Sequence, residues 1–303
     1  MLMNTLKKIG KILLIILGAL VGLYIVLFIA SRLMTKKVAQ AEWYKDASGT
    51  TILLAHQGGE GEFPSNTKLA FEQATIAGAD VLDTDVHITR DGVLVLAHDE
   101  TLDYRTNGKG AIRDKTYEEL KRVDFAYNWS SDGGKTYPYR GRGIGVYTLD
   151  ELFKDYPTKR FGIEIKQVST EAVHKFCASI KQARLEPRVL VSSVTQPNMD
   201  SFRSQCPTVP TSATNAEAKQ FYIWQKLGLV GFYRPKFTSL QVPEKQGSLT
   251  VMDKAFAGNA HRLGLKVINW TIDTPEQAKH FIDLGADGII TSYPSRVIQS
   301  GIF

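Results

Sequence analysis

Apolar and polar positions along the chain follow two alternating periods. Short runs of apolar or β-branched residues are typical of buried strands, and between them apolar residues recur at helical spacing. The strand-like runs are residues 51–56, 81–86, 160–166, 189–193, 209–212, 238–242, 266–271 and 288–291. The helical segments are residues 67–77, 149–156, 170–183, 198–206, 215–227, 251–263 and 275–284. This alternation predicts an α/β protein with a parallel sheet, and its length suits a (β/α)8 TIM barrel of about 250 residues. An open doubly wound sheet is the alternative, although no GxGxxG motif follows the first strand.

One irregular region interrupts this pattern after the second strand. Residues 93–97 form an additional strand-like run, which we expect to return as a hairpin after Asp91-Gly92. Residues 99–146 then show no regular period and hold many Gly, Tyr and charged residues. A loop of this length predicts a small insertion after strand 2, because long loops in compact domains are usually functional.

The chain begins with an apolar run, Ile12–Ala30, that contains no charged side chain. Its length matches the roughly 20 residues needed to cross a bilayer as a helix. We therefore expect a transmembrane anchor at residues 1–34, a polar linker at 35–49 and a globular domain at 50–303. A cleaved signal peptide is the main alternative, because Ala39-Gln-Ala41 has the spacing of a cleavage site. A buried core helix is a further alternative.

The formal net charge of +6 belongs to this N-terminal region. Six of the 37 basic residues lie in residues 1–40, which hold no acidic residue, so the other 31 balance the 31 acidic residues. A neutral globular domain argues against a nucleic-acid partner. Basic residues flank both ends of the apolar run equally, so only a slight preference places the domain on the non-cytoplasmic side of the membrane.

Cys177 and Cys206 are the only cysteines. No CxxC motif or Cys/His cluster suggests zinc. We expect two buried free thiols, and a disulfide is the alternative if the domain is exported.

Polar side chains gather where the predicted strands end, and these ends meet at one mouth of a barrel. Asp83 and Asp85 are two residues apart in a strand and so share one face, and Glu164 lies on the next predicted strand. Carboxylates buried together repel unless a cation or a proton lies between them. The three therefore predict an oxygen site for Mg²⁺ or Ca²⁺.

Two histidines lie at the same predicted mouth. His56 follows the first strand and His98 follows the hairpin. Because imidazole exchanges protons near neutral pH, we expect these two to act as general acid and base in breaking a P–O bond. The other four histidines, His87, His174, His261 and His280, lack such neighbours and are interpreted as surface or packing residues.

Two further residues suit a phosphate ester. Lys166 offers a point charge for a phosphate oxygen, or alternatively a salt bridge to Glu164 or Asp85. Trp270, at the end of the seventh predicted strand, suits either stacking on a small polyol at the mouth or packing in the core.

Together these motifs resemble the glycerophosphodiester phosphodiesterase family over about residues 51–296. The segments that carry the resemblance are His56-Gln-Gly-Gly, Pro64-Ser-Asn-Thr67, Gly78-Ala-Asp, Asp83-Thr-Asp85-Val, Thr89-Arg-Asp-Gly92, His98-Asp99, Thr106-Asn-Gly108-Lys-Gly110, Tyr147-Thr-Leu-Asp-Glu151, Ile163-Glu-Ile-Lys166, Asn269-Trp-Thr271 and Gly285-Ala-Asp-Gly-Ile-Ile-Thr291.

The resemblance implies a distorted TIM barrel that hydrolyses glycerophosphodiesters to glycerol 3-phosphate and an alcohol with a divalent metal. It implies that His56 and His98 are the acid/base pair and that Lys166 contacts phosphate. It also implies that Trp270 lies beside the glycerol. The three carboxylates would hold the metal.

Four positions depart from the family pattern. Gln57 replaces an Arg, so an amide takes the place of a fixed positive charge on phosphate. Ser65 replaces a Glu, Asp83 replaces a longer Glu, and Tyr104 stands where an Arg is usual, with Arg105 next to it. Two alternatives follow: a lysophospholipase D acting on membrane lysophospholipids, suggested by the anchor, or a phosphodiester-binding scaffold without activity.

Overall fold

Seven parallel strands form most of a closed barrel in the computed structural model, which describes residues 2–47 and 51–303. The end of the expected linker, at 48–49, and the first residue of the expected domain lie outside the described residues. The strands are β1 (Ile52–Ala55), β2 (Val81–Ile88), β4 (Arg160–Ile165), β5 (Val189–Ser192), β6 (Ser239–Val242), β9 (Lys266–Asn269) and β10 (Gly288–Thr291). Their order in space is β5-β4-β2-β1-β10-β9-β6. The predicted TIM barrel is confirmed, and the open doubly wound sheet is wrong.

The gap between β5 and β6 is closed by the segment that we expected to be the fifth strand, residues 209–212. It forms only single parallel bridges, from Thr211 to Val191 and from Ser212 to Ser239. The expectation of a regular strand there is wrong. Pro207 and Pro210 lack backbone N–H groups, so this short segment cannot sustain a continuous ladder.

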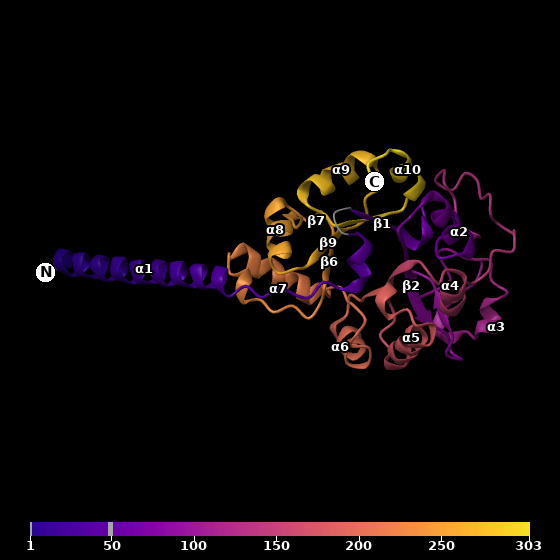
Figure 1. Cartoon of the computed structure of the whole chain (residues 1–303), viewed down its shortest axis with the longest axis horizontal. Coiled ribbons are helices and arrows are strands. Elements are labelled where there is room, and N and C mark those ends of the chain that lie inside the picture. Colours follow the sequence, from indigo (N-terminus) through magenta and orange to yellow (C-terminus); the bar gives the residue numbers. More distant parts are fainter. Residues whose placement is uncertain (1, 48–50) are drawn as a thin grey trace.

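The hairpin after β2 is confirmed, because β3 (Leu94–Leu96) pairs antiparallel with β2. The insertion that follows contains η3 (Ile112–Asp114) and α3 (Tyr117–Leu120) in otherwise irregular chain, and it lies far from the N-terminal helix in Figure 1. A small core of its own, around Leu102, Ile112 and Phe125, holds it together.

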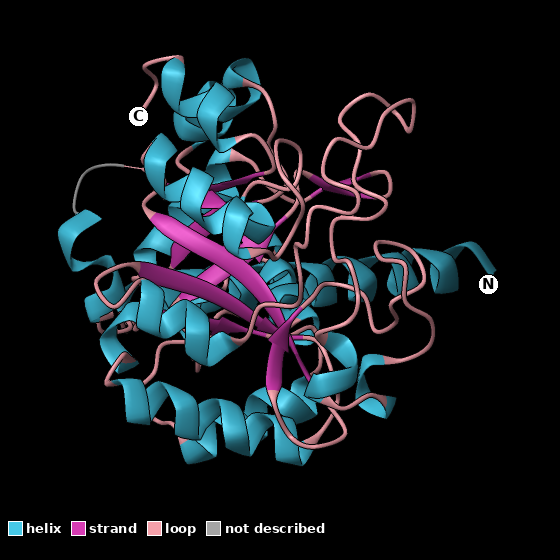
Figure 2. Cartoon of the chain, turned by 90° about the vertical axis from the view of Figure 1, so that its right-hand side faces the viewer, coloured by secondary structure: helices cyan, strands magenta, loops and turns pink. Residues whose placement is uncertain are grey.

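Helices surround the strands (Figure 2). They are α2 (Lys68–Ala77), α4 (Leu149–Asp155), α5 (Thr170–Ala183), α6 (Gln196–Gln205), α7 (Asn215–Lys226), α8 (Lys254–Arg262), α9 (Pro275–Leu284) and α10 (Pro294–Gln299). Seven correspond to predicted helices, and α10 was not predicted. The N-caps explain several helix starts: Thr148 and Thr214 each form a capping box, so α4 and α7 begin directly after them. Between β6 and α8, a small hairpin of β7 (Lys245–Gln246) and β8 (Leu249–Thr250) extends from the barrel.

The N-terminal helix α1 (Leu2–Leu33) projects from the body of the molecule in Figure 1. It is long and apolar enough to span a membrane, a property that a signal sequence shares. Its last turns contact η5 (Val230–Phe232), next to the end of α7.

The segment after α1, expected as a polar linker, packs against the barrel. It contains η1 (Glu42–Ala47), and Trp43 and Tyr44 are almost completely buried. Trp43 Nε1 donates to the carbonyl of Phe161 at 3.1 Å, and both aromatic rings join a core cluster with residues from the starts of β1 and β2. These two side chains therefore form the floor of the barrel, opposite its mouth.

Cys177 and Cys206 form a disulfide, so the expectation of two free thiols is wrong. Cys177 lies in α5 and Cys206 follows α6, and these helices pack together so that the two Cα atoms are 6.0 Å apart. That separation suits a disulfide. Sequence spacing alone does not reveal it, because the approach depends on how the two helices pack.

Candidate active site

The predicted site residues meet at the mouth of the barrel. His56 follows β1, Asp83 and Asp85 lie in β2, Glu164 lies in β4, and Lys166 follows β4. In the parallel register, Asp85 lies directly beside Glu164. His98 reaches the same region from the end of the β3 hairpin, where its charge acts on Glu164.

His56 is oriented by a carboxylate from its own loop. Its Nδ1 lies 3.0 Å from Glu60 Oε1, and Nδ1 donates because a carboxylate only accepts. Its Nε2 then carries the lone pair and lies 3.3 Å from the side-chain nitrogen of Gln57, the donor of that contact. Burial opposes protonation of His56, but the hydrogen bond to Glu60 and the charges of Asp83, Glu60 and Asp85 outweigh it and raise the His56 pKa.

His98 has the same arrangement. Its Nδ1 donates to Asp99 Oδ1 at 2.8 Å, and its side chain is 38% exposed. Nε2 is therefore the nitrogen available to a substrate. Each imidazole thus has Nδ1 held by a carboxylate, which leaves Nε2 as the nitrogen for proton transfer, and in His56 this nitrogen also contacts the Gln57 amide.

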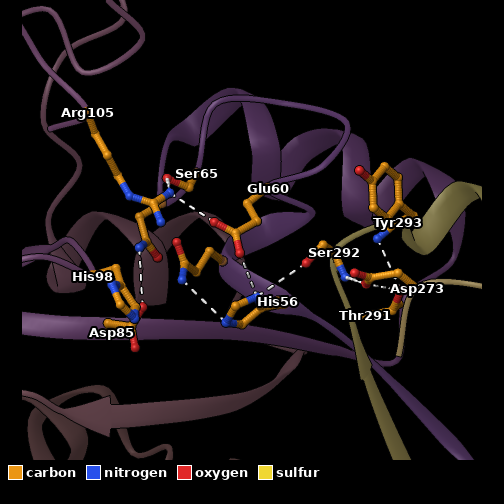
Figure 3. Close-up of polar contacts among 12 residues, drawn as sticks. His56, Glu60, Ser65, Asp85, His98, Arg105, Asp273, Thr291, Ser292 and Tyr293 are labelled. Carbon is orange, nitrogen blue, oxygen red and sulfur yellow. Dashed lines mark hydrogen bonds and ion pairs between the residues drawn. The ribbon is translucent and has the colours of Figure 1, made fainter. Parts of the chain in front are cut away.

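Arg105, from the insertion, connects these two pairs, and Figure 3 shows its contact with Glu60. Its Nη1 donates to Glu60 Oε2 at 2.9 Å, and its Nε donates to Asp99 Oδ2 at 3.2 Å. A continuous chain of charged hydrogen bonds therefore runs from one histidine to the other. Burial opposes the ionisation of Glu60, but the hydrogen bond and charge of His56, with the charge of Arg105, lower its pKa to about 2.

Arg105 also connects two of the departures from the family pattern. Its Nη1 donates to Ser65 Oγ at 2.6 Å, at the position where the family has a Glu. Arg105 directly follows Tyr104, which stands where the family has its Arg and is 76% exposed.

The carboxylates lie close enough to perturb one another. Burial is the main cause that raises the pKa of Asp83 to about 8, and the charges of Asp85 and Glu164 add to it. Gly162 lies opposite Asp83 in β4, and a Cβ atom there would collide with the Asp83 carboxylate. A glycine at 162 therefore makes room for this acid.

Lys166 lies between two of the acids. Its Nζ is 2.8 Å from Glu164 Oε2 and 3.3 Å from Asp85 Oδ1, so the salt-bridge alternative holds in this structure. Over residues 2–47 and 51–303, no three His, Cys, Asp or Glu side chains converge tightly enough to form a ready metal cluster. Glu164 Oε1 is nevertheless buried without a hydrogen-bond partner, and the charges of Asp85 and Glu164 act on the buried Asp83. The donor set therefore fits an oxygen-preferring divalent cation.

Two amides flank the acids. Gln57 is buried in a left-handed backbone conformation (φ 53°), and its Oε1 has no partner. Asn66 donates to Asp85 Oδ2 at 3.4 Å and accepts from Thr84 at 2.6 Å, which orients Asp85.

Trp270 follows β9 and is 43% exposed. Its alternative role in core packing is therefore wrong. The preceding Asn269 is fully buried, and its Oδ1 has no hydrogen-bond partner.

The remaining histidines lie outside this constellation. His87 is buried and contacts the carbonyl of His98 at 3.3 Å, which is a packing role. His174 is exposed on α5, and His261 pairs with Asp287 at 2.7 Å. Sequence reasoning missed Glu60 and Arg105 as partners of the site, and the spacing of Glu60 four residues after His56 was the available signal.

The barrel is shared with solved phosphodiesterases. The structure of a phosphodiesterase from Oleispira antarctica in complex with the product sn-glycerol-3-phosphate superposes with a TM-score of 0.64 at 21% identity, covering 83% of this chain and 96% of that one. A glycerophosphodiester phosphodiesterase from Caldanaerobacter subterraneus subsp. tengcongensis is 29% identical over 260 residues, which cover 82% of this chain and 97% of that protein. The protein named lysophospholipase D GDPD1 from Homo sapiens is 24% identical over 269 residues, covering 80% and 84%.

The sequence pattern of the glycerophosphoryl diester phosphodiesterase family matches residues 56–296, and the chain belongs to that family. It is therefore an enzyme, a phosphoric diester hydrolase that acts on glycerophosphodiesters. This removes the alternative of a scaffold without activity.

Proposed function

We propose that the chain hydrolyses glycerophosphodiesters to glycerol 3-phosphate and an alcohol by acid/base catalysis at His56 and His98, with a divalent metal held by the acids. The observation that carries this proposal is the matched pair of imidazoles, each with Nδ1 bound to a carboxylate and Nε2 available. One Nε2 takes the proton of the attacking hydroxyl, and the other gives a proton to the leaving alcohol.

The acids interact electrostatically with both imidazoles, which supports this division of work. The charge of Asp83 acts on His56, and the charge of His98 acts on Glu164. A phosphate bound at the acids would therefore have both a proton acceptor and a proton donor near it.

Asp83, Asp85 and Glu164 are the proposed ligands of Mg²⁺ or Ca²⁺. The cation would supply Lewis-acid polarisation of the phosphate and would neutralise the acids that Lys166 neutralises in part here. Lys166 would then be available to a phosphate oxygen as a point charge. Gln57 would donate a hydrogen bond to phosphate, and the exposed ring of Trp270 would lie beside the glycerol.

The histidine assignment is tested by His56→Ala and His98→Ala, with the exposed His174→Ala as the matched control. Release of glycerol 3-phosphate from glycerophosphocholine should fall by about 10²–10⁴-fold in each active-site variant and stay unchanged in the control. Full activity in either active-site variant would remove that residue from the mechanism.

The metal assignment needs a separate measurement. Treatment with a chelator should abolish turnover, and Mg²⁺ or Ca²⁺ should restore it. The variants Asp83→Asn and Glu164→Gln should need a higher metal concentration for half-maximal activity. Turnover that is insensitive to the chelator would refute the metal and leave the histidine pair to be judged by its own variants.

Two observations favour a second substrate class. The chain carries a helix that would hold it at a membrane, and two relatives are named lysophospholipase D. Equal or better rates on monoacylated than on deacylated diesters would establish that class as the substrate.

We propose further that α1 is retained as a single-pass membrane anchor. Its end is integrated into the fold: the buried Ser31 hydroxyl accepts from the backbone N–H of Gly231 at 2.9 Å, and Tyr24 Oη donates to the carbonyl of Leu227 at 3.0 Å. A cleaved signal peptide has no need of such contacts. The disulfide supports a domain on the non-cytoplasmic side, because disulfides persist in oxidising compartments.

A further inference from the structure

On the surface where α1 meets the domain, apolar side chains lie beside the helix and basic side chains lie at and beyond its end. We call this surface the collar. Its members all lie within the last turns of α1, the segment after it, the end of α7, the chain after η5, and the end of α8. They are Ile223, Leu227, Arg32, Lys36, Lys37, Arg234 and Arg262.

The apolar part of the collar lies beside the apolar run of α1. Ile223 and Leu227 are each 49% exposed, and they are four residues apart, so they share one face of the end of α7. The carbonyl of Leu227 accepts from Tyr24 Oη at 3.0 Å, and Figure 1 shows α7 beside the end of α1. Tyr24 precedes the end of the apolar run at Ala30 by six residues, or roughly 9 Å of helix. A spanning α1 therefore puts this face on the acyl side of the headgroup boundary.

The basic part lies farther along the chain, where the apolar run ends. Arg234 Nη2 donates to the carbonyl of Met34 at 3.1 Å, and Arg262 Nη2 donates to Thr35 Oγ1 at 3.1 Å. These bonds tie two guanidinium groups of the domain to the first residues beyond the helix. Lys36 and Lys37 follow directly and are exposed.

These basic groups lack anionic partners. Nearby Lys226 and Lys266 pair with carboxylates at 3.2 and 2.8 Å. In the described parts of the chain, by contrast, none of the five basic members of the collar forms an ion pair with a carboxylate. Arg32 lies close enough to Arg262 that its charge, after burial, lowers the Arg262 pKa. Like charges gathered without acids favour an external anion.

This order of apolar and then basic side chains matches the surface of a lipid bilayer. Apolar side chains at the depth of the helix, followed by cations at its end, correspond to the acyl boundary and the phosphates of a bilayer. We propose that the collar binds the phosphates of anionic lipids and that Ile223 and Leu227 enter the acyl boundary below them. The inference rests on the proposed anchoring of α1, and it adds that the domain itself is held on the membrane surface in one orientation.

The test uses the full chain in lipid nanodiscs of phosphatidylcholine alone or with phosphatidylglycerol. Hydrogen exchange is measured over residues 226–236, and turnover of glycerophosphocholine reports that the enzyme is folded. Anionic lipid should slow exchange there by about fivefold or more, and added salt should reverse the effect. The double variant Arg234→Gln/Arg262→Gln should lose the lipid dependence and keep its turnover. The matched control Arg113→Gln/Lys121→Gln, in the insertion, should keep both.

Each other outcome has a distinct meaning. Equal exchange in the two lipid compositions overturns the proposal that the collar binds lipid, but it leaves the proposed membrane anchor untouched. The same slowing on addition of inorganic phosphate to phosphatidylcholine discs also overturns it, because the partner would then be a free anion. A chain that does not insert into discs overturns the anchor, and the collar with it.

Discussion

Removal of Arg105 tests whether the chain of hydrogen bonds between the two histidines matters for catalysis. Arg105→Gln deletes the ion pairs to Glu60 and Asp99 and the hydrogen bond to Ser65, at 2.9, 3.2 and 2.6 Å. The acids and Arg105 are 23–30% exposed, so solvent screens part of each interaction. Taking about 1.5 kcal/mol for each of the two ion pairs and reducing this for solvent screening, we expect a loss of about 2–3 kcal/mol in unfolding free energy.

The effect on catalysis comes from orientation. Without Arg105, Glu60 and Asp99 can rotate, and the imidazoles that they hold lose their fixed direction. We expect kcat to fall by about 10–100-fold with little change in KM, because Arg105 acts through the histidines. Arg105→Lys should be intermediate, since an ammonium keeps the charge but cannot reach both acids with one planar fork.

Arg113→Gln is the matched control. Arg113 also lies in the insertion and pairs with Glu100 at 3.2 Å, but both side chains are 57% exposed. We expect a loss of less than about 0.5 kcal/mol and unchanged kcat. Urea unfolding and steady-state kinetics on glycerophosphocholine provide both measurements. If Arg105→Gln loses stability while kcat per folded molecule is unchanged, Arg105 does not orient the histidines. Its role would then be only to stabilise the insertion.

Three further predictions concern protonation, cross-linking and packing. Glu60→Gln removes the negative charge that helps to raise the His56 pKa, so the limb of the pH profile of kcat/KM governed by His56 should move to lower pH; an unmoved profile would contradict the pairing. Replacing Cys177 and Cys206 by Ser opens a loop with a sequence separation of 29, and urea unfolding should show a loss of about 3.5 kcal/mol on the chain-entropy estimate. Wild type under reducing conditions should show the same loss, and stability that is indifferent to reduction would argue against the disulfide. Trp43→Ala should lower unfolding free energy by about 3–5 kcal/mol by leaving a cavity in the floor of the barrel, whereas a change below 1 kcal/mol would mean that the floor is dispensable.

The barrel was predictable because its strands are mostly buried and therefore appear as short apolar runs between helical periods. Even β10, Gly288–Thr291, stands out in this way. The exceptions have local causes. Residues 209–212 have the composition of a strand. Pro207 lies before the segment and Pro210 lies inside it, and the segment forms only two bridges. The helix α10 has only six residues, which is too short for a helical period to show.

The candidate site was predictable in part, because the ends of parallel strands converge whatever the loops do. That rule places His56, Asp83 and Glu164 together. Loop contacts follow no such rule. Arg105 reaches Glu60 across 45 residues of sequence, and this approach depends on the path of the whole insertion. The disulfide escaped prediction for the same reason, since it depends on how α5 and α6 pack.

The aromatic floor sets a limit on how the enzyme can be shortened. Trp43 and Tyr44 precede β1 but belong to the same core cluster as Ile52 and Leu54. A truncated chain that starts after Tyr44 would expose the undersides of these strands to water, even though every residue of the mouth would be intact. Soluble versions of the enzyme should therefore start at or before Glu42. Poor yield from shorter versions would indicate that the floor of the barrel is missing, and not that the active site is defective.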